Sequence, residues 1–384
     1  MIRVLHVTED HSAANTGISS AVDALTRCVP PEICPSIASV GEETLPVRPG
    51  VGLVTFPTHG LAKTWRYAGG SGAALARAVA ESDVVHLHGL WMWVQWAAAR
   101  AAVRQNKPFV LSPHGMLEPW IWQRQSALNR LKKYLYWQAV AYPAFRQAAR
   151  VHALTLQESR TLAEYFSAQK ALLIPHGIDL AAADQSLAGL PPRPADQPPY
   201  FLFLGRLHPV KAIHLLLRAF ARLPKSPFVL KLAGPTQPQE AAYAASLQQL
   251  SAELGMGQRV EFTGPVRGQA KWQMYRDAWA FCLPSFSEVI GLVNLEAAAA
   301  RTPVITSYES GVVEEWDRQG GLRVHPEVDS ILAGLRQALA WSDAERQERG
   351  QSLRALVERQ YGWERVGKEW ADAYQSLAGA GQHA

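Results

Sequence analysis

The feature that most constrains the fold is an alternation of short apolar runs with longer helical patterns along the 384-residue chain. A helix is expected over residues 17–28, and a Trp- and Ala-rich helix ends near residue 102. The apolar runs predict strands at residues 2–8, 83–89, 107–115, 150–155 and 171–177. Apolar strands separated by helices are typical of a parallel sheet that is covered on both faces.

Residues 184–199, DQSLAGLPPRPADQPP, interrupt this alternation and have the composition of a linker. Beyond them the alternation restarts, with strands predicted at residues 200–205, 228–234, 259–264, 280–285 and 302–307. The sequence therefore predicts two doubly wound α/β domains, residues 1–183 and 200–362, that face each other across a cleft. Ligands of such sheets bind at the carboxyl ends of the strands.

The composition limits the compartment and the partners. A formal charge of +5 and a pI of about 9.1 favour anionic partners, namely phosphates, nucleic acid or a membrane surface. Three cysteines, none in a Cys-x-x-Cys pair, fit a reducing cytosol. The first residues lack the regions of a signal peptide, and no apolar stretch reaches the roughly 18 residues of a spanning helix. We therefore expect a cytoplasmic protein, dissolved or held peripherally at the inner face of the membrane.

Two cations follow the first predicted strand of the second domain, in the stretch GRLHPVK. Arg206 and Lys211 are five residues apart across a turn that leads into a helix N-terminus. Cations beside free backbone N–H groups are the donors that a diphosphate prefers. The alternative is an exposed arginine and lysine on an ordinary loop.

Two glutamates lie in PSFSEVIGLVNLEAAAA, residues 284–300, with seven residues between them. Glu288 is expected in the loop after a strand, and Glu296 inside the following helix. The N-terminal amides of that helix, a favourable seat for a phosphate, belong to Ile290, Gly291, Leu292 and Val293. Carboxylates beside a phosphate should accept hydrogen bonds from hydroxyls, such as those of a sugar and a ribose. Alternatively, the two are a helix-start acid and a solvated helical residue.

Together these stretches resemble the retaining GT-B glycosyltransferases of glycosyltransferase family 4. IPHGID at 174–179, FTGPV at 262–266 and TPVITS at 302–307 extend the resemblance over most of the chain. It implies transfer of a hexose, mannose or another, from a GDP- or UDP-hexose to a saccharide acceptor with retention of configuration. The donor diphosphate would be bound by Arg206 and Lys211, the donor sugar by Glu288, and the ribose by Glu296.

Two loops of the first domain also match that family. SPHGMLEPW, residues 112–120, resembles the family's Thr/Ser-x-His-Gly loop, which makes His114 a catalytic-site residue facing the donor sugar. NTGISSAV, residues 15–22, resembles the first glycine-containing loop, which approaches the phosphate and the acceptor. Thr16 and Gly17 are its matching positions. Residues 363–384 are expected to form a helix that packs back on the first domain, as in related proteins.

The chain departs from the family pattern in the first loop, where Thr16 precedes Gly17 in place of the usual double glycine, and at two further positions. Val289 follows the first glutamate, and Ala212 follows the lysine, where the family usually has glycine. Valine does not readily adopt a positive φ, so the loop geometry is expected to differ there. The departures at Val289 and Ala212 favour the rival interpretation, a non-catalytic binding protein with a degenerate GT-B fold that holds a nucleotide or a saccharide. A phosphorylase-like or epimerase relative is a further alternative.

No bound metal or other cofactor is expected. His86 and His88 share one face of a strand, but no carboxylate or cysteine cluster accompanies them, and the chain has no Asp-x-Asp motif. Positive side chains and helix amides would stabilise the leaving diphosphate instead. Nucleic acid is not expected as a partner, because no recognition-helix motif is present.

The stretch 120–150 contains six basic residues, many aromatic residues and no acid. Leu128, Leu131 and Leu135 recur at helical spacing within it. A basic amphipathic helix of this kind fits the surface of an anionic membrane. The alternative is that the aromatic residues pack on the first sheet. Similar family members act on lipid-linked saccharides in exopolysaccharide and O-antigen assembly, which makes a lipid-linked acceptor the expected one.

Overall fold

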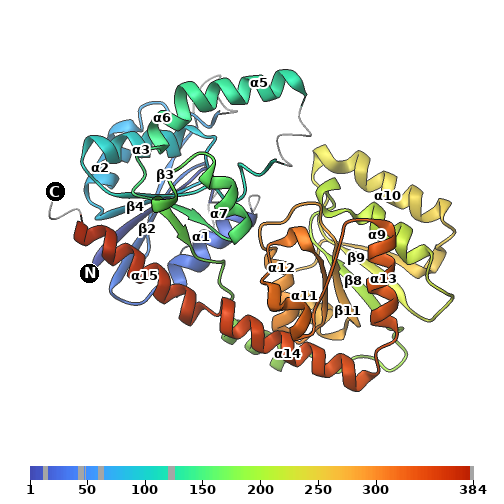
Figure 1. Ribbon diagram of the computed structural model, residues 1–384. Coiled ribbons are helices and arrows are strands. Elements are labelled where there is room, and N and C mark those ends of the chain that lie inside the picture. Colours follow the sequence, from blue (N-terminus) through green and yellow to red (C-terminus); the bar gives the residue numbers. More distant parts are fainter. Residues whose placement is uncertain (12–15, 42–46, 48, 59–64, 120–125, 381–384) are drawn as a thin grey trace. The chain divides into compact units, whose positions relative to one another are not determined.

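The chain folds into two compact units in the computed structural model (Figure 1). Unit 1 consists of Met1–Gly177 with Trp363–Ala384, and unit 2 consists of Ile178–Gly362. The structure describes all residues except 12–15, 42–46, 48, 59–64, 120–125 and 381–384.

The predicted linker differs from the observed division. Residues 184–199 lie inside unit 2, and their first part belongs to α8 (Leu180–Ala188). Their polar composition fits a surface helix that is held by charge, since Asp184 Oδ2 accepts from Arg354 Nη2 at 2.8 Å. The chain passes between the units after Gly177 and again after Gly362.

Unit 1 is a seven-stranded sheet with the order β3-β2-β1-β4-β5-β6-β7, and all its neighbouring strands are parallel. Its strands are β1 (Ile2–Thr8), β2 (Ile33–Val40), β3 (Gly52–Phe56), β4 (Val84–His88), β5 (Phe109–Ser112), β6 (Arg150–Ala153) and β7 (Ala171–Leu173). Its helices are α1 (Thr16–Cys28), α2 (Gly72–Ala80), α3 (Trp93–Arg104), α5 (Ala127–Tyr136), η2 (Trp137–Ala141), α6 (Tyr142–Phe145), α7 (Leu156–Ala163) and α15 (Trp363–Ala380). The sequence did not predict β2 and β3.

Unit 2 is a six-stranded parallel sheet with the order β10-β9-β8-β11-β12-β13. Its strands are β8 (Tyr200–Leu204), β9 (Val229–Ala233), β10 (Val260–Gly264), β11 (Ala280–Leu283), β12 (Val304–Ser307) and β13 (Leu322–Val324). Besides α8, its helices are α9 (Ile213–Ala221), α10 (Ala241–Glu253), α11 (Gly268–Asp277), α12 (Leu292–Ala299), α13 (Val328–Leu339) and α14 (Asp343–Tyr361). Two doubly wound α/β units are the fold that the sequence predicts.

The inner strands β4, β5, β8 and β11 are buried and mostly apolar, whereas the edge strands β3, β7 and β10 have exposed or half-buried residues. All five residues of β8 and all four of β11 are buried. Such continuous burial is typical of parallel strands that are covered by helices on both faces. Among the described helices, none is both long and apolar enough to cross a membrane.

The C-terminal helix α15 belongs to unit 1, where it lies along the sheet (Figure 1). Its buried Val366, Trp370 and Tyr374 form one apolar cluster with Val4 and Val84 of the two central strands. The final helix of the chain therefore completes the core of the first unit.

Candidate functional site

Lys211 and Glu288 meet at the carboxyl end of the unit 2 sheet. Lys211 ends the 3-10 turn η4 (Pro209–Lys211) after β8, and Glu288 lies in the loop after β11. These strands are neighbours in the sheet, so their loops leave it side by side. Lys211 Nζ donates a hydrogen bond to Glu288 Oε2, and the side chains are only 16% and 17% exposed. The structure thus brings into contact Lys211, which the family resemblance assigned to the donor diphosphate, and Glu288, which it assigned to the donor sugar.

Left-handed backbone flanks this pair on both sides. Ala212 has a φ of 53° and caps α9, while Gly291 has a φ of 61° and caps α12. The positive φ that we expected to be difficult for Val289 therefore occurs at Gly291 instead. A Cβ at Gly291 would lie 2.9 Å from Glu288 Cγ, so glycine is required there by both conformation and space.

The first turn of α12 has free amide donors. Its first residues are Leu292 and Val293, and no described side chain caps the helix. Asn294 is buried and donates to the Ile290 carbonyl at 3.4 Å and to Thr306 Oγ1 at 3.2 Å, which ties the loop to β12. The backbone of 290–293 therefore presents the N-terminal end of a helix, where an anion is favoured.

Glu296 is held by two side chains of α11. Its Oε1 accepts from Lys271 Nζ at 2.7 Å, and its Oε2 accepts from the Tyr275 hydroxyl at 2.9 Å. Burial, followed by the charge of Glu296, raises the pKa of Tyr275 well above its ordinary value, so the hydroxyl remains a donor. The side chain of Glu296 is 23% exposed. It is therefore an oriented acceptor and not a freely solvated helical residue.

Arg206 lies in a different ion pair from Lys211. Its Nη1 is 3.2 Å from Glu240 Oε1 and 3.4 Å from Gln237 Oε1, at the start of α10. The Arg206 side chain is 43% exposed, whereas that of Glu240 is 7% exposed. Arg206 thus keeps much of its surface accessible to a ligand while its direction is set by a buried carboxylate.

In unit 1, His114 occupies a strained loop after β5. Its φ is 53°, and Gly115 beside it has a φ of 76°. The buried carboxylate of Glu158 holds this turn, because its Oε1 accepts from the Gly115 amide at 2.6 Å and its Oε2 from the Leu154 amide at 2.8 Å. Left-handed backbone outside glycine is often found at functional sites, where the surroundings hold it in place.

The His114 ring is a half-buried member of a cluster of imidazoles. Its Nε2 lies 3.0 Å from His88 Nδ1, and its ring stacks on His176 at a centroid distance of 5.8 Å. Burial, with smaller effects from His176 and His152, holds the pKa of His114 well below its ordinary value. The imidazole is therefore neutral near pH 7 and can either donate or accept a hydrogen bond.

Gly17 lies at the start of α1, on the surface of unit 1. A Cβ at this position would meet no described atom within 4 Å, which leaves space beside the first helical turn. The backbone of Thr16 begins the same helix, but its side chain lies outside the described part of the structure. Their predicted contact with phosphate and acceptor stays a prediction.

Among the described residues, His6, His86 and His88 can place ligand atoms within 4.8 Å of one another. Both ring nitrogens of His86 already have partners, the Tyr374 hydroxyl at 2.8 Å and Ser112 Oγ at 2.6 Å. A metal ion could bind His86 only after one of these hydrogen bonds was broken. The arrangement is that of a hydrogen-bonded network.

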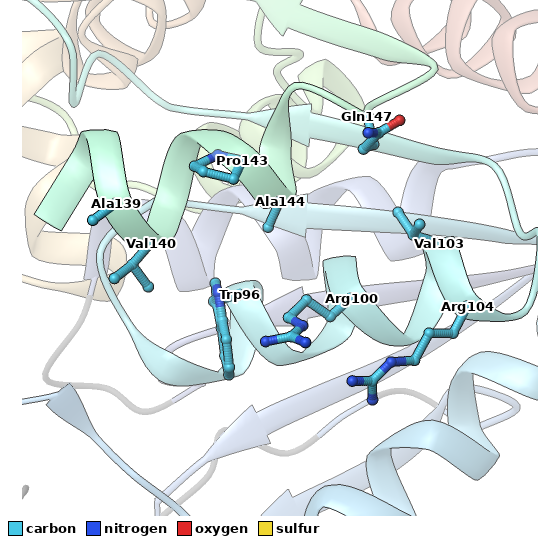
Figure 2. Close-up of a pocket in the computed structure, with 9 residues that line it drawn as sticks. All are labelled: Trp96, Arg100, Val103, Arg104, Ala139, Val140, Pro143, Ala144 and Gln147. Carbon is cyan, nitrogen blue, oxygen red and sulfur yellow. The ribbon is translucent and has the colours of Figure 1, made fainter.

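A separate open pocket of about 400 Å³ lies in unit 1 between α3 and the η2–α6 segment (Figure 2). Its walls are mostly apolar, and Arg100 and Arg104 contribute its charges. Arg100 lies over the Trp96 ring at 4.9 Å, a cation–π contact. The pocket adjoins the basic segment that the sequence singled out, and none of the predicted donor-binding residues lines it.

Two family models match the chain. The one described as Glycosyltransferase Family 4 covers residues 26–182, and the one described as Glycosyl transferases group 1 covers residues 191–352. The chain belongs to glycosyltransferase family 4. This membership and the two-unit α/β fold confirm the family and the fold class that the sequence predicted.

Relatives of this family 4 chain include two proteins named D-inositol 3-phosphate glycosyltransferase. The one from Nocardia farcinica is 31% identical over 211 residues, which is 52% of this chain but only 44% of the relative. The one from Streptomyces scabiei is 28% identical over 350 residues, or 81% of this chain and 71% of the relative. Among solved structures, Anabaena HepE in complex with UDP and glucose shares the fold, with a TM-score of 0.74, 16% identity, and coverage of 98% and 100%.

Sequence reasoning missed several side chains that orient the site. Lys271 and Tyr275 hold Glu296, Glu240 holds Arg206, and Glu158 holds the turn at His114. Only Glu158 had a signal in the sequence, because it lies in the helix after the predicted strand RVHALT, and that strand ends at the same sheet edge as the loop of His114. Its spacing does not indicate a partner 43 residues away.

Proposed function

We propose that the protein transfers a hexose from a nucleoside diphosphate sugar to a saccharide acceptor, with retention of anomeric configuration and without a metal ion. The observation that carries this proposal is the Lys211–Glu288 pair beside the uncapped N-terminus of α12. A cation, free helix amides and a carboxylate there match the three needs of a donor: diphosphate charge, phosphate oxygens and sugar hydroxyls.

Each charged group has a separate role in this proposal. Lys211, Arg206 and the amides of residues 290–293 stabilise the negative charge that develops on the leaving diphosphate. When the diphosphate binds Lys211, Glu288 is released from that ion pair and accepts hydrogen bonds from the sugar. Glu296, oriented by Tyr275 and Lys271, accepts from the ribose hydroxyls.

His114 of unit 1 provides a neutral imidazole to the donor sugar. Because its pKa is depressed by burial, it neither carries charge near pH 7 nor serves readily as a strong base. The departing phosphate oxygen would then accept the proton of the acceptor hydroxyl, which is the front-face course usually described for this family. UDP- and GDP-hexoses are the donors to test first, and the UDP and glucose bound in HepE support the former.

Two measurements test this proposal. A thermal-shift screen against UDP, GDP, ADP and their hexoses should single out one nucleotide, because a ligand that binds only the folded state raises the melting temperature. Consumption of the matching nucleotide sugar should then be abolished by Glu288→Ala. Glu253→Ala, at an exposed site on α10, is the matched control. Nucleotide binding without any donor consumption by the wild type would instead identify a non-catalytic binding protein.

The acceptor side of the proposal rests on α5. Leu128, Leu131 and Leu135 are 54–61% exposed along one face of this helix, and none of its residues is buried. Arg130 and Lys132 on the same helix are also exposed. Exposed leucines with basic neighbours fit the interface of an anionic membrane, where a lipid-linked acceptor for cell-surface polysaccharide synthesis would be found. Trp120, Trp122 and Arg124, part of the predicted basic stretch, lie outside the described residues.

Sedimentation with vesicles tests this surface. Binding to vesicles of phosphatidylcholine mixed with the anionic lipid phosphatidylglycerol should fall by more than about tenfold in a triple leucine-to-serine variant of α5, because three apolar side chains are removed from the interface. A double variant of two other exposed leucines of unit 1, Leu156→Ser with Leu173→Ser, should bind like the wild type. If the α5 variant and the control variant bind the vesicles equally well, α5 does not bind the membrane.

A further inference from the structure

Six histidines of unit 1 converge at the carboxyl end of its sheet. His6 lies on β1, His86 and His88 on β4, and His152 on β6, while His114 and His176 lie in loops. His6 and His86 are register partners on neighbouring strands, so they share one face. Trp370 of α15 covers this face, with its ring 4.7 Å from both His86 and His152.

The hydrogen bonds of one branch fix its tautomers. His152 Nε2 lies 2.7 Å from the Ile174 carbonyl, which can only accept, so this nitrogen carries the proton. His152 Nδ1 must then accept from Ser112 Oγ at 2.7 Å. Ser112 in turn accepts from His86 Nε2 at 2.6 Å, and His86 Nδ1 accepts from the Tyr374 hydroxyl at 2.8 Å. Every proton in this branch has one consistent place.

The second branch leads to the site. His6 Nδ1 lies 3.0 Å from His88 Nε2, and His88 Nδ1 lies 3.0 Å from His114 Nε2. His6 and His88 are fully buried, and His6 Nε2 has no partner among the described residues. A buried N–H without an acceptor costs more than a buried lone pair without a donor. His6 therefore carries its proton on Nδ1 and donates to His88, which donates to His114.

We propose that His88, supported by His6, is a positioning residue that fixes the His114 ring with its proton on Nδ1. The tautomer of His114 follows from the hydrogen bonds alone, and only the contact of His114 with the donor sugar rests on the proposed function. With Nε2 engaged as the acceptor of the His88 proton, His114 offers an N–H donor to a ligand and has no free basic nitrogen. It acts as a hydrogen-bond donor to the donor substrate, not as a general base.

The buried position of His88 allows a matched pair of variants. The amide nitrogen of Asn takes the place of His Nδ1, so His88→Asn keeps the bond to His114 and loses the bond to His6. The amide of Gln takes the place of Nε2, so His88→Gln keeps His6 and loses His114. Each variant removes one hydrogen bond. His88→Asn should be the less stable of the two, because it leaves the buried His6 N–H without an acceptor, whereas His88→Gln leaves only a His114 lone pair without a donor. A role in folding alone would therefore lower the activity of His88→Asn more than that of His88→Gln.

The test is nitrogen-15 NMR of the full chain labelled at histidine, with His114 assigned by His114→Gln. The wild type and His88→Asn should show His114 protonated on Nδ1, and His88→Gln should show the Nε2-protonated form that free imidazole prefers. With a nucleotide hexose that the wild type turns over, kcat of His88→Gln should fall about tenfold to a hundredfold through misplacement of His114. KM should change little, and His88→Asn should stay within about threefold of the wild type in kcat.

The NMR result does not depend on finding the donor, so failure of this inference and failure of the proposed function are distinguishable. Tyr374→Phe, which perturbs only the other branch, should leave the His114 tautomer unchanged. An Nε2-protonated His114 in the wild type, or the same tautomer in both His88 variants, would overturn the proposal. Stoichiometric metal in the purified chain, bound by His6, His86 and His88, would overturn it as well.

Discussion

Glu158 gives the sharpest prediction for stability, because it is a carboxylate that is only 2% exposed. Burial raises its pKa from 4.5 to about 7, although the amides of Leu154 and Gly115 favour the charged form and act in the opposite direction. Between these two pH values the folded chain retains a proton that the unfolded chain has released. The free energy of unfolding should therefore fall as the pH rises through this interval.

The size of this effect follows from linkage. One pH unit corresponds to about 1.4 kcal/mol for a single proton, so the interval from 4.5 to about 7 amounts to roughly 3 kcal/mol. Glu158→Gln removes the titrating group. Its amide nitrogen would face one of the two backbone N–H donors, so we expect the variant to be less stable than the wild type at pH 5 by about 1–3 kcal/mol.

Urea denaturation at pH 5 and at pH 8 measures the difference. Other titrating groups are common to both proteins, so the stability advantage of the wild type over Glu158→Gln should shrink by about 3 kcal/mol between the two conditions. Glu164→Gln, an exposed position just beyond α7, should follow the wild type at both pH values. If the gap between wild type and Glu158→Gln is independent of pH, the buried carboxylate does not titrate as inferred.

Three further predictions concern the two units. Gly291→Ala places a methyl group against Glu288 at a residue whose φ is 61°, so the melting temperature should fall by an amount corresponding to about 1–2 kcal/mol. The variant should also lose the thermal shift induced by the nucleotide, and an unchanged shift would contradict the assigned phosphate site. Tyr275→Phe removes one hydrogen bond to Glu296, which should weaken binding of the nucleotide sugar by about 1 kcal/mol and raise its KM about fivefold at constant kcat. A fall in kcat with an unchanged KM would argue against ribose binding by Glu296. Burial lowers the pKa of His6 and of His152 from 6.5 to about 3, so below pH 6.5 the unfolded chain takes up protons that the folded chain does not. The free energy of unfolding should then fall by roughly 1.4 kcal/mol per pH unit for each histidine, and amide exchange of unit 1 that does not accelerate between pH 6 and pH 4, after correction for the intrinsic rates, would refute this.

The sequence by itself determined the class of fold and the family. Runs such as YFLFL and AFCL are apolar at every position, and only a strand buried on both faces suits them. Because helices separate such runs, the sheets had to be parallel, and their carboxyl-end loops had to carry the motifs with Arg206, Lys211 and Glu288. Local composition is sufficient for these conclusions, since burial and periodicity are properties of short segments.

Only the tertiary structure decided which side chains meet. The ion pair between Lys211 and Glu288 joins residues 77 positions apart, and the hydrogen bond between His6 and His88 joins residues 82 positions apart. Neither spacing has a local signature, because both depend on which strands become neighbours in the sheet. Strand order likewise brings the loop of His114 to the buried carboxylate of Glu158. The sequence therefore indicates which residues lie at the ends of the strands. It does not indicate which of them are in contact, because hydrogen bonds and ion pairs depend on proximity in space, and the order of the strands in the sheet sets that proximity.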